Sequence, residues 1–100
     1  MSASNIYAVY KTASGQAING RTRMNGVYFT HDSGGPSTIQ FYDGTADTDP
    51  LIMTLSTTTV ADSQNFVIPE QGILFKEGLY VKFGATVLSV TVLYEGGDAA

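Results

Sequence analysis

The sequence predicts an all-β fold, a small antiparallel β-sandwich or barrel of about eight short strands. None of the 100 residues belongs to a run in which apolar side chains recur at helical spacing. Apolar residues instead form short blocks separated by Gly, Asp, Ser and Pro, a spacing typical of sandwiches and barrels. Between these blocks lie four segments rich in turn formers: SGQAING, DSGGPS, DGTADTDP and TTTVADSQ.

Eight strands follow from this pattern, in chain order at residues 5–11, 23–31, 37–42, 51–56, 65–69, 73–76, 78–83 and 86–95. A chain of this length is the size of one domain and can bury one core. Disulfides cannot contribute, because Cys is absent. We therefore expect a single domain over residues 1–100, with short flexible termini at about 1–4 and 96–100.

The first and fourth strands alternate, so each is expected to bury one face. The residues expected to point inward are Ile6, Ala8, Tyr10, Leu51, Met53 and Leu55. The opposite faces are also apolar in part, with Tyr7, Val9 and Ile52 pointing outward.

The last two strands, 78–83 and 86–95, are expected to form a hairpin. Gly84-Ala85 would be its two-residue loop, with Gly at the first position as a type II′ turn prefers. The facing pairs are then Phe83–Thr86, Val81–Leu88 and Leu79–Val90. Leu88, Val90, Val92 and Tyr94 share the inward face in this register, which leaves Val87 and Leu93 outward.

Strands that are apolar on both faces predict a subunit interface, because a chain this small has little to cover a second sheet face. The interface residues expected from this argument are Val87, Leu93 and Ile52, with Tyr7 and Tyr80 in addition. The alternative is a compact barrel with ordinary surface hydrophobic residues.

The charge pattern argues against two classes of partner. The chain has five Lys and Arg residues and nine Asp and Glu residues, and only Arg21 and Arg23 lie close together in the sequence. No nucleic-acid partner is therefore expected. The apolar runs are far shorter than the ~20 residues that span a membrane, so no membrane partner is expected. Met1–Asn5 also lacks the pattern of a signal peptide.

The segment HDSGGP, residues 31–36, is similar to the sequence around the nucleophile of trypsin-like serine proteases. That chemistry needs a His from a distant part of the chain, whereas His31 is the sole His and lies two residues before Ser33. Without a second His or a Cys, His31 is also a poor zinc ligand. The segment is better explained as a glycine-rich loop.

Carboxylates offer two further kinds of chemistry. Asp43, Asp47 and Asp49 could supply some ligands of a calcium ion, but their spacing is not that of an EF-hand, and turn carboxylates usually accept their own backbone N–H groups. A pair of acids could serve glycoside hydrolysis. The acids are Asp32, Asp43, Asp47, Asp49, Asp62, Glu70, Glu77, Glu95 and Asp98. Nearly all lie in predicted turns, so we expect neither an enzyme nor a cofactor, and the calcium question stays open.

Four tyrosines on predicted strands could form a platform for sugar rings: Tyr7, Tyr28, Tyr42 and Tyr80. Tyr is also enriched at protein interfaces. Because no Trp is present and no polar cluster is evident beside these residues, the protein interface is favoured over the glycan.

The segment FVIPEQGILFKEGLYVKFGATVLSVTVLYE, residues 66–95, resembles the ends of small virion proteins of tailed bacteriophages. There a Pro precedes a Gly-led apolar strand, GLYV, a tight turn and VTVLYE or a close relative. The resemblance implies a jelly-roll or Ig-like sandwich that decorates a phage head as a cement protein, commonly as a homotrimer. It further implies partners among other copies and the major capsid protein or other virion subunits, and localisation to the virion after assembly in the host cytoplasm. The alternative is a carbohydrate- or receptor-binding module of a tail or fibre.

Overall fold

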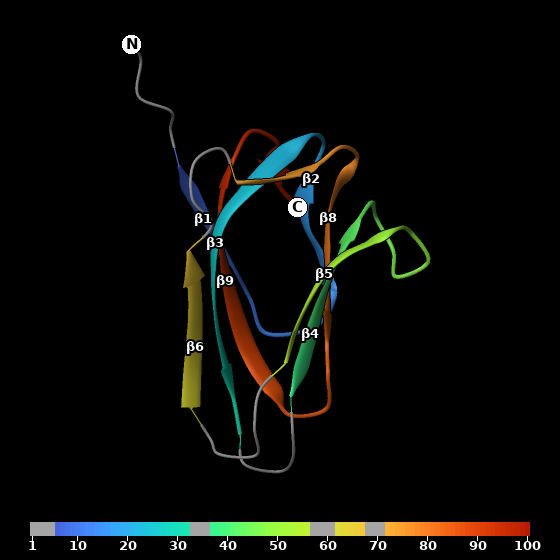
Figure 1. Cartoon of the computed structure of the whole chain (residues 1–100). Helices are drawn as coiled ribbons and strands as arrows, with labels where there is room; N and C mark the ends of the chain where they lie inside the picture. Colours follow the sequence, from blue (N-terminus) through green and yellow to red (C-terminus); the bar gives the residue numbers. More distant parts are fainter. Residues whose placement is uncertain (1–5, 33–36, 57–61, 68–71) are drawn as a thin grey trace.

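The computed structural model describes residues 6–32, 37–56, 62–67 and 72–100, and it contains ten strands in two antiparallel sheets. The prediction of an all-β sandwich is therefore confirmed. The two sheets stack face to face, as the two layers of Figure 1 show. No helix long and apolar enough to cross a membrane occurs in these ranges.

Sheet A is the layer that contains the two longest strands. Its strands, from one edge to the other, are β1 (Tyr7–Lys11), β9 (Val87–Glu95), β3 (Thr22–His31) and β6 (Asp62–Val67), with β7 (Ile73–Phe75) also paired to β3. The strands β6 and β7 follow one another along the same side of β3, so together they occupy one strand position.

Sheet B is the opposite layer. In spatial order it holds β10 (Asp98–Ala99), β2 (Gly15–Asn19), β8 (Gly78–Phe83), β4 (Thr38–Asp43) and β5 (Leu51–Ser56).

The order of pairing is that of a jelly roll. The antiparallel pairs are nested, since β1 pairs with β9, β2 with β8, β3 with β6 and β7, and β4 with β5. Such nesting arises when one long hairpin folds over into two sheets, which gives two Greek keys. An Ig-like sandwich would instead place its first two strands side by side, whereas β1 and β2 lie in different sheets. Of the two sandwich types expected from the resemblance, the strand order therefore selects the jelly roll.

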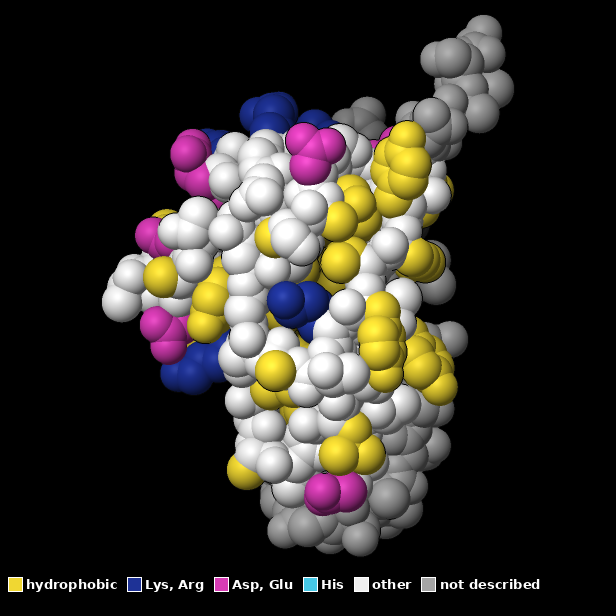
Figure 2. Space-filling view, turned by 180° about the vertical axis from the view of Figure 1, so that it is seen from behind, with side chains coloured by type: hydrophobic (Ala, Val, Ile, Leu, Met, Phe, Trp, Pro, Cys, Tyr) yellow, Lys and Arg dark blue, Asp and Glu magenta, His cyan; other side chains and the backbone are white. Residues whose placement is uncertain are grey.

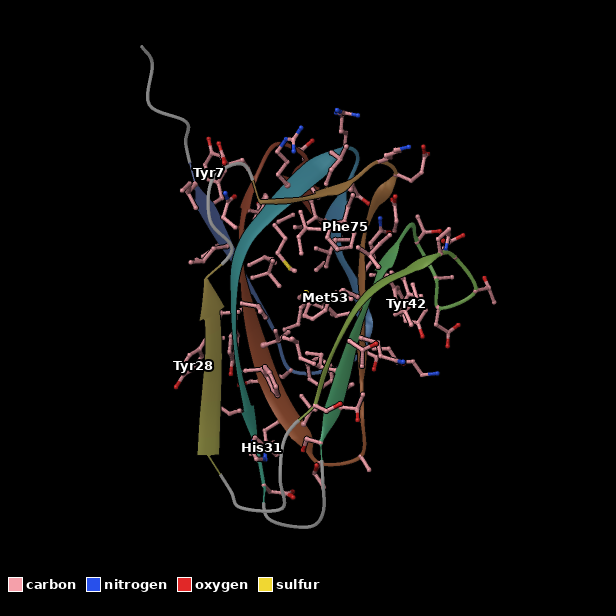
Figure 3. All side chains as sticks on the ribbon, viewed as in Figure 1. Tyr7, Tyr28, His31, Tyr42, Met53 and Phe75 are labelled. Carbon is pink, nitrogen blue, oxygen red and sulfur yellow. The ribbon has the colours of Figure 1, made fainter. Side chains whose placement is uncertain are left out.

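The core lies between the sheets and is built from alternate residues of both. Its fully buried large side chains include Met24, Phe29, Ile39, Phe41, Phe75, Leu79, Val81, Val90 and Val92. Figure 3 shows Phe75 and Met53 pointing into the space between the layers. The alternation of apolar residues along each strand thus fills a single interior, as a sandwich requires.

The predicted hairpin of the last two long strands is wrong. Strand β8 lies in sheet B and β9 in sheet A, so they face each other across the core and do not pair. The N–H of Val87 donates to Gly84 O at 3.2 Å, which closes a turn where the chain crosses between sheets. At Gly84 a side chain would be excluded, because a Cβ there would lie 2.5 Å from Thr38 O.

The inward and outward faces of β9 also differ from the prediction at its start. The register pairs Thr30 with Ser89 but His31 with Val87, so Leu88 is an extra residue in a β-bulge. Beyond the bulge the prediction holds, with Val90, Val92 and Tyr94 buried. Before it the faces exchange: Leu88 is 52% exposed and Val87 only 8% exposed.

In β1 the predicted faces are reversed. Val9 pairs with Val92 and packs against the core, whereas Ala8 and Tyr10 are exposed. In β5 the prediction is correct for Met53 and Leu55, which pack against the core. A register shift between Phe41 and Tyr42 leaves Leu51 exposed instead of inward.

Two strands were not expected from the sequence. The segment SGQAING, taken as a turn, contains β2, and the C-terminal residues form β10 against β2. The N–H of Ala100 also donates to Ala17 O at 3.0 Å, so the chain end is hydrogen-bonded where a flexible terminus was expected. Residues 1–4 lie outside the described ranges.

A candidate interaction surface on sheet A

The outer face of sheet A carries rows of side chains that the register brings together. One row runs from Ala8 through Leu93 to Gly26. The next runs from Tyr10 through Thr91 to Tyr28. We refer to Ala8, Tyr10, Tyr28, Thr91 and Leu93 as the apolar face.

The side chains of the apolar face are uncharged, and the three large ones are exposed. Tyr10 is 63% exposed, Tyr28 45% and Leu93 41%. Ile6, directly before β1, and Leu88 at the bulge are exposed as well. Figure 2 shows hydrophobic side chains gathered along the side of the molecule where β1 lies, and Figure 3 shows Tyr28 pointing away from the core. A contiguous surface of this kind is typical of a site that another molecule covers.

Polar groups border the apolar face at both ends of the strands. At one end Arg23 pairs with Glu95 in the register, and Asn25 Nδ2 donates to Glu95 Oε1 at 3.0 Å. At the other end the hydroxyls of Thr30 and Ser89 are 2.7 Å apart and hydrogen-bonded. The surface therefore has an apolar centre and a polar rim, the usual composition of a protein interface.

The outer face of sheet B has a different character. Lys82 Nζ lies 3.3 Å from an oxygen of Asp47, and Gln40 pairs with Lys82 in the register. The rings of Tyr42 and Tyr80 meet edge to face with centroids 6.3 Å apart, and Tyr42 Oη donates to Gln40 Oε1 at 3.0 Å. Sheet B thus presents a polar surface with an aromatic pair.

The five predicted interface residues do not form one surface. Leu93 belongs to the apolar face, Tyr80 lies on the outer face of sheet B, and Ile52 and Tyr7 are exposed on edge strands β5 and β1. The prediction for Val87 is corrected by the structure. The bulge at Leu88 turns Val87 into the core, where its side chain cannot form part of a surface.

Two members of the apolar face were predicted on the opposite side of β1, because the predicted faces of this strand were reversed. Ala8 and Tyr10 were expected in the core. A signal was present in the sequence, since Val9 is the β-branched residue of this strand and suits a packed position.

His31, which was considered for catalysis and zinc binding, is buried. His31 is 2% exposed and its Nδ1 contacts Asp32 O at 3.2 Å, while Ser33–Pro36 lie outside the described ranges. Within the residues the structure describes, no three His, Asp or Glu side chains meet as a metal site.

In the acidic loop, residues 43–49, carboxylates accept hydrogen bonds from backbone N–H groups. Asp43 accepts the N–H groups of Lys76 and Glu77 at 3.0 and 2.7 Å. Asp49 Oδ2 accepts those of Thr45 and Ala46 at 2.8 and 3.2 Å. The Asp49 bonds are the local pattern that turn carboxylates commonly make, and the Asp43 bonds join the loop to the β7–β8 turn.

Comparisons with known proteins identify no family. No family model matches the chain, and no curated protein matches it. A solved structure of the Tobacco streak virus coat protein is similar with a TM-score of 0.45 and 11% sequence identity, over 97% of this chain and 90% of that one. Both values are too low to carry a conclusion about function.

Proposed function

We propose that this chain is a non-enzymatic structural subunit of a virion, which assembles with other copies of itself and with neighbouring capsid subunits. The observation that carries the proposal is the apolar face of sheet A, which is exposed, uncharged and rimmed by polar groups. In this proposal, neighbouring subunits cover the apolar face in the assembled virion.

The composition of the face suits protein better than other partners. Tyr10 and Tyr28 bring large rings with few rotatable bonds, and Leu93 lies at the centre of the neighbouring row. Such residues bury much apolar area for little lost side-chain entropy. The face has no Lys or Arg to attract phosphate, and the whole chain carries a net charge of −4.

The fold and the sequence resemblance support the same role. Jelly rolls serve as subunits of viral shells and also as lectin domains. The resemblance to virion proteins of tailed phages favours the shell, and within it the decoration of a head by a cement protein. A homotrimer is the oligomer that the resemblance suggests, although the edge strand β1 favours a two-fold arrangement.

The second candidate is a carbohydrate-binding module of a tail or fibre. It would use the outer face of sheet B, where Tyr80 lies between Gln16 and Tyr42 in the register. This candidate is weaker, because Tyr42 is only 8% exposed and its hydroxyl is already bonded to Gln40. One available ring is a small platform for a sugar.

The test is binding to virus particles. We expect mass spectrometry to find the chain in virions purified from its source, and the purified chain to co-sediment with heads from which it has been stripped. Leu93→Asp should reduce this binding about tenfold or more, because an apolar anchor that the partner would cover becomes a charge. The matched control is Thr54→Asp, an exposed position on the outer side of sheet B, which should bind normally.

Absence of the chain from purified virions would contradict the proposal. Normal particle binding by Leu93→Asp, with Thr54→Asp defective, would move the interface to sheet B. Specific binding in a glycan array, lost on Tyr80→Ala, would favour the carbohydrate module instead.

A further inference from the structure

The strand β1 forms one edge of sheet A, and it lacks the features that usually keep an edge strand from pairing. Its sole partner among the described strands is β9. Its sequence, YAVYK, has no Pro, no Gly and no acidic residue, and its one charge is Lys11 at the end. Natural edge strands are commonly blocked by central charges, prolines, bulges or short length.

Two other edges of the sandwich do show such features. Strand β10 is two residues long and begins with Asp98. Strand β5 is disturbed by the register shift beside Tyr42 and Leu51. The edge formed by β1 is therefore better suited than either of these two to accept a further strand.

We propose that two copies of this chain pair antiparallel through β1, so that the two A sheets join into one continuous sheet about a two-fold axis near Val9. The inference deepens the proposed function, on which it rests, by naming the self-contact of the subunit. A strand that pairs with its own copy must do so about a two-fold axis, so the unit is a dimer.

The sequence of β1 is complementary to itself in this arrangement. Full overlap of the two strands places Val9 opposite Val9, and Ala8 opposite Tyr10 of the second copy. The small Ala8 side chain leaves room for the Tyr10 ring on the outer face. Cross-strand pairs of small and aromatic residues are compatible at the spacing of about 5 Å between facing Cβ atoms.

The pairing also extends the apolar face. The row Gly26–Leu93–Ala8 of one copy would continue into the row Tyr10–Thr91–Tyr28 of the other. The dimer would thus present one apolar face of twice the width, uncharged across its centre. One continuous face can bury a larger area against a neighbouring capsid subunit than two separate faces can.

Charges at the two ends of β1 are complementary across the axis. At one end Tyr7 lines an open depression of about 290 Å³ together with Tyr94 and Asp98. At the other end Lys11 lies over β2, since a Cβ built at Gly15 would be 3.4 Å from its Nζ. Neither Lys11 nor Asp98 has an ion-pair partner within the described part of the chain.

Antiparallel pairing places Lys11 of each copy opposite Tyr7 of the other. The ammonium group then comes to the depression that holds Asp98, beside the Tyr7 ring. It can approach the carboxylate and the ring face together, and two-fold symmetry repeats this contact at both ends. A second copy therefore fits the charges of this edge, whereas an arbitrary strand from another protein would not.

The absence of Cys allows a register-specific cross-linking test. Chains carrying Ala8→Cys and Tyr10→Cys are mixed and oxidised mildly, and disulfide-linked heterodimers are measured by mass spectrometry. Positions 8 and 10 face each other in the proposed register at about 5 Å, within the reach of a disulfide, whereas position 8 is about 8 Å from its own copy. We expect the mixture to cross-link at least about fivefold faster than either variant alone.

The oligomeric state gives an independent measurement that keeps both Tyr10 side chains. The unmodified chain should have twice the mass of a 10.6 kDa monomer in light scattering after gel filtration. Ala8→Asp should weaken the dimer about tenfold or more, because it sets a carboxylate against Tyr10 of the copy. Thr54→Asp, on the edge strand of sheet B, is the matched control and should remain dimeric.

A monomer at all accessible concentrations, or a trimer without preferential linkage of positions 8 and 10, would overturn the dimer. The two proposals fail separately. A dimer that shows the cross-link but does not bind heads keeps this inference and removes the virion function. A monomer that binds heads does the reverse.

Discussion

Val87 and Leu88 are sequence neighbours in opposite environments. The bulge at Leu88 turns Val87 into the core at 8% exposure and leaves Leu88 52% exposed. We therefore expect Val87→Asp to lower the free energy of unfolding by about 3 kcal/mol or more, because a carboxyl group enters an apolar interior. Leu88→Asp should lower it by less than about 1 kcal/mol. Urea unfolding followed by circular dichroism measures both.

The opposite result would restore the register expected from the sequence. In that register Leu88 is a core residue and Val87 lies outside, so the Leu88 variant would be the unstable one. Equal effects of the two substitutions would mean that β9 begins later than Val87. Each outcome therefore assigns the position of the bulge.

This pair of residues also shows what alternation can and cannot predict. Alternation correctly places Val90, Val92 and Tyr94 inside and Leu93 outside. A bulge adds one residue without a sequence signal of its own, so every position before it changes face. Val87 was predicted at the interface for this reason.

At the scale of an element, the carboxylate of Asp43 joins the end of β4 to the turn before β8. It accepts two backbone N–H groups, those of Lys76 and Glu77, at 3.0 and 2.7 Å. Asp43→Ala should lower the free energy of unfolding by about 1–3 kcal/mol, because two donors lose a charged acceptor.

Asp47 provides the matched control for that prediction. Its ion pair with Lys82 lies at the surface, with both side chains nearly half exposed, so Asp47→Ala should change stability by less than about 1 kcal/mol. Equal losses in the two variants, measured by urea unfolding at one pH, would contradict the role given to Asp43. The comparison separates a structural carboxylate from one that serves solvation.

The existence of most strands followed from the sequence, but their partners did not. Leu79, Val81, Val90 and Val92 were expected to share one face, and they do share one interior. Inward residues of two facing strands have the same pattern as those of a hairpin, because both sets point to one core. Three residues, 84–86, suffice to cross the ~10 Å between sheets, so loop length does not distinguish the two arrangements.

At the scale of the molecule, the candidate surface depended on the topology. Leu93 and Tyr28 were recognisable as exposed strand residues, yet their position in adjacent rows follows from the pairing of β9 with β3. The addition of Tyr10 to this face requires β1 to pair with β9, a contact between the two ends of the chain. A single sequence carries little information on such distant pairing, since many strand orders satisfy the same alternation.

The nested pairing also orders the steps of folding. Strands β4 and β5 are close in sequence, and Phe41 pairs with Met53 across a short loop. Strands β1 and β9 join Val9 to Val92, so closing them loses far more chain entropy. We expect the first pair to form in the transition state and the second to form after it.

This order is testable with two core truncations. Met53→Ala should mainly slow refolding, whereas Val9→Ala should mainly speed unfolding, each for a loss of about 1–2 kcal/mol of stability. Stopped-flow measurements in urea give both rates, and they should be made at a concentration where the chain is monomeric so that association does not contribute. If Val9→Ala slowed refolding as strongly as Met53→Ala, the pairing of β1 with β9 would already be formed in the transition state. Sheet A would then close early in folding.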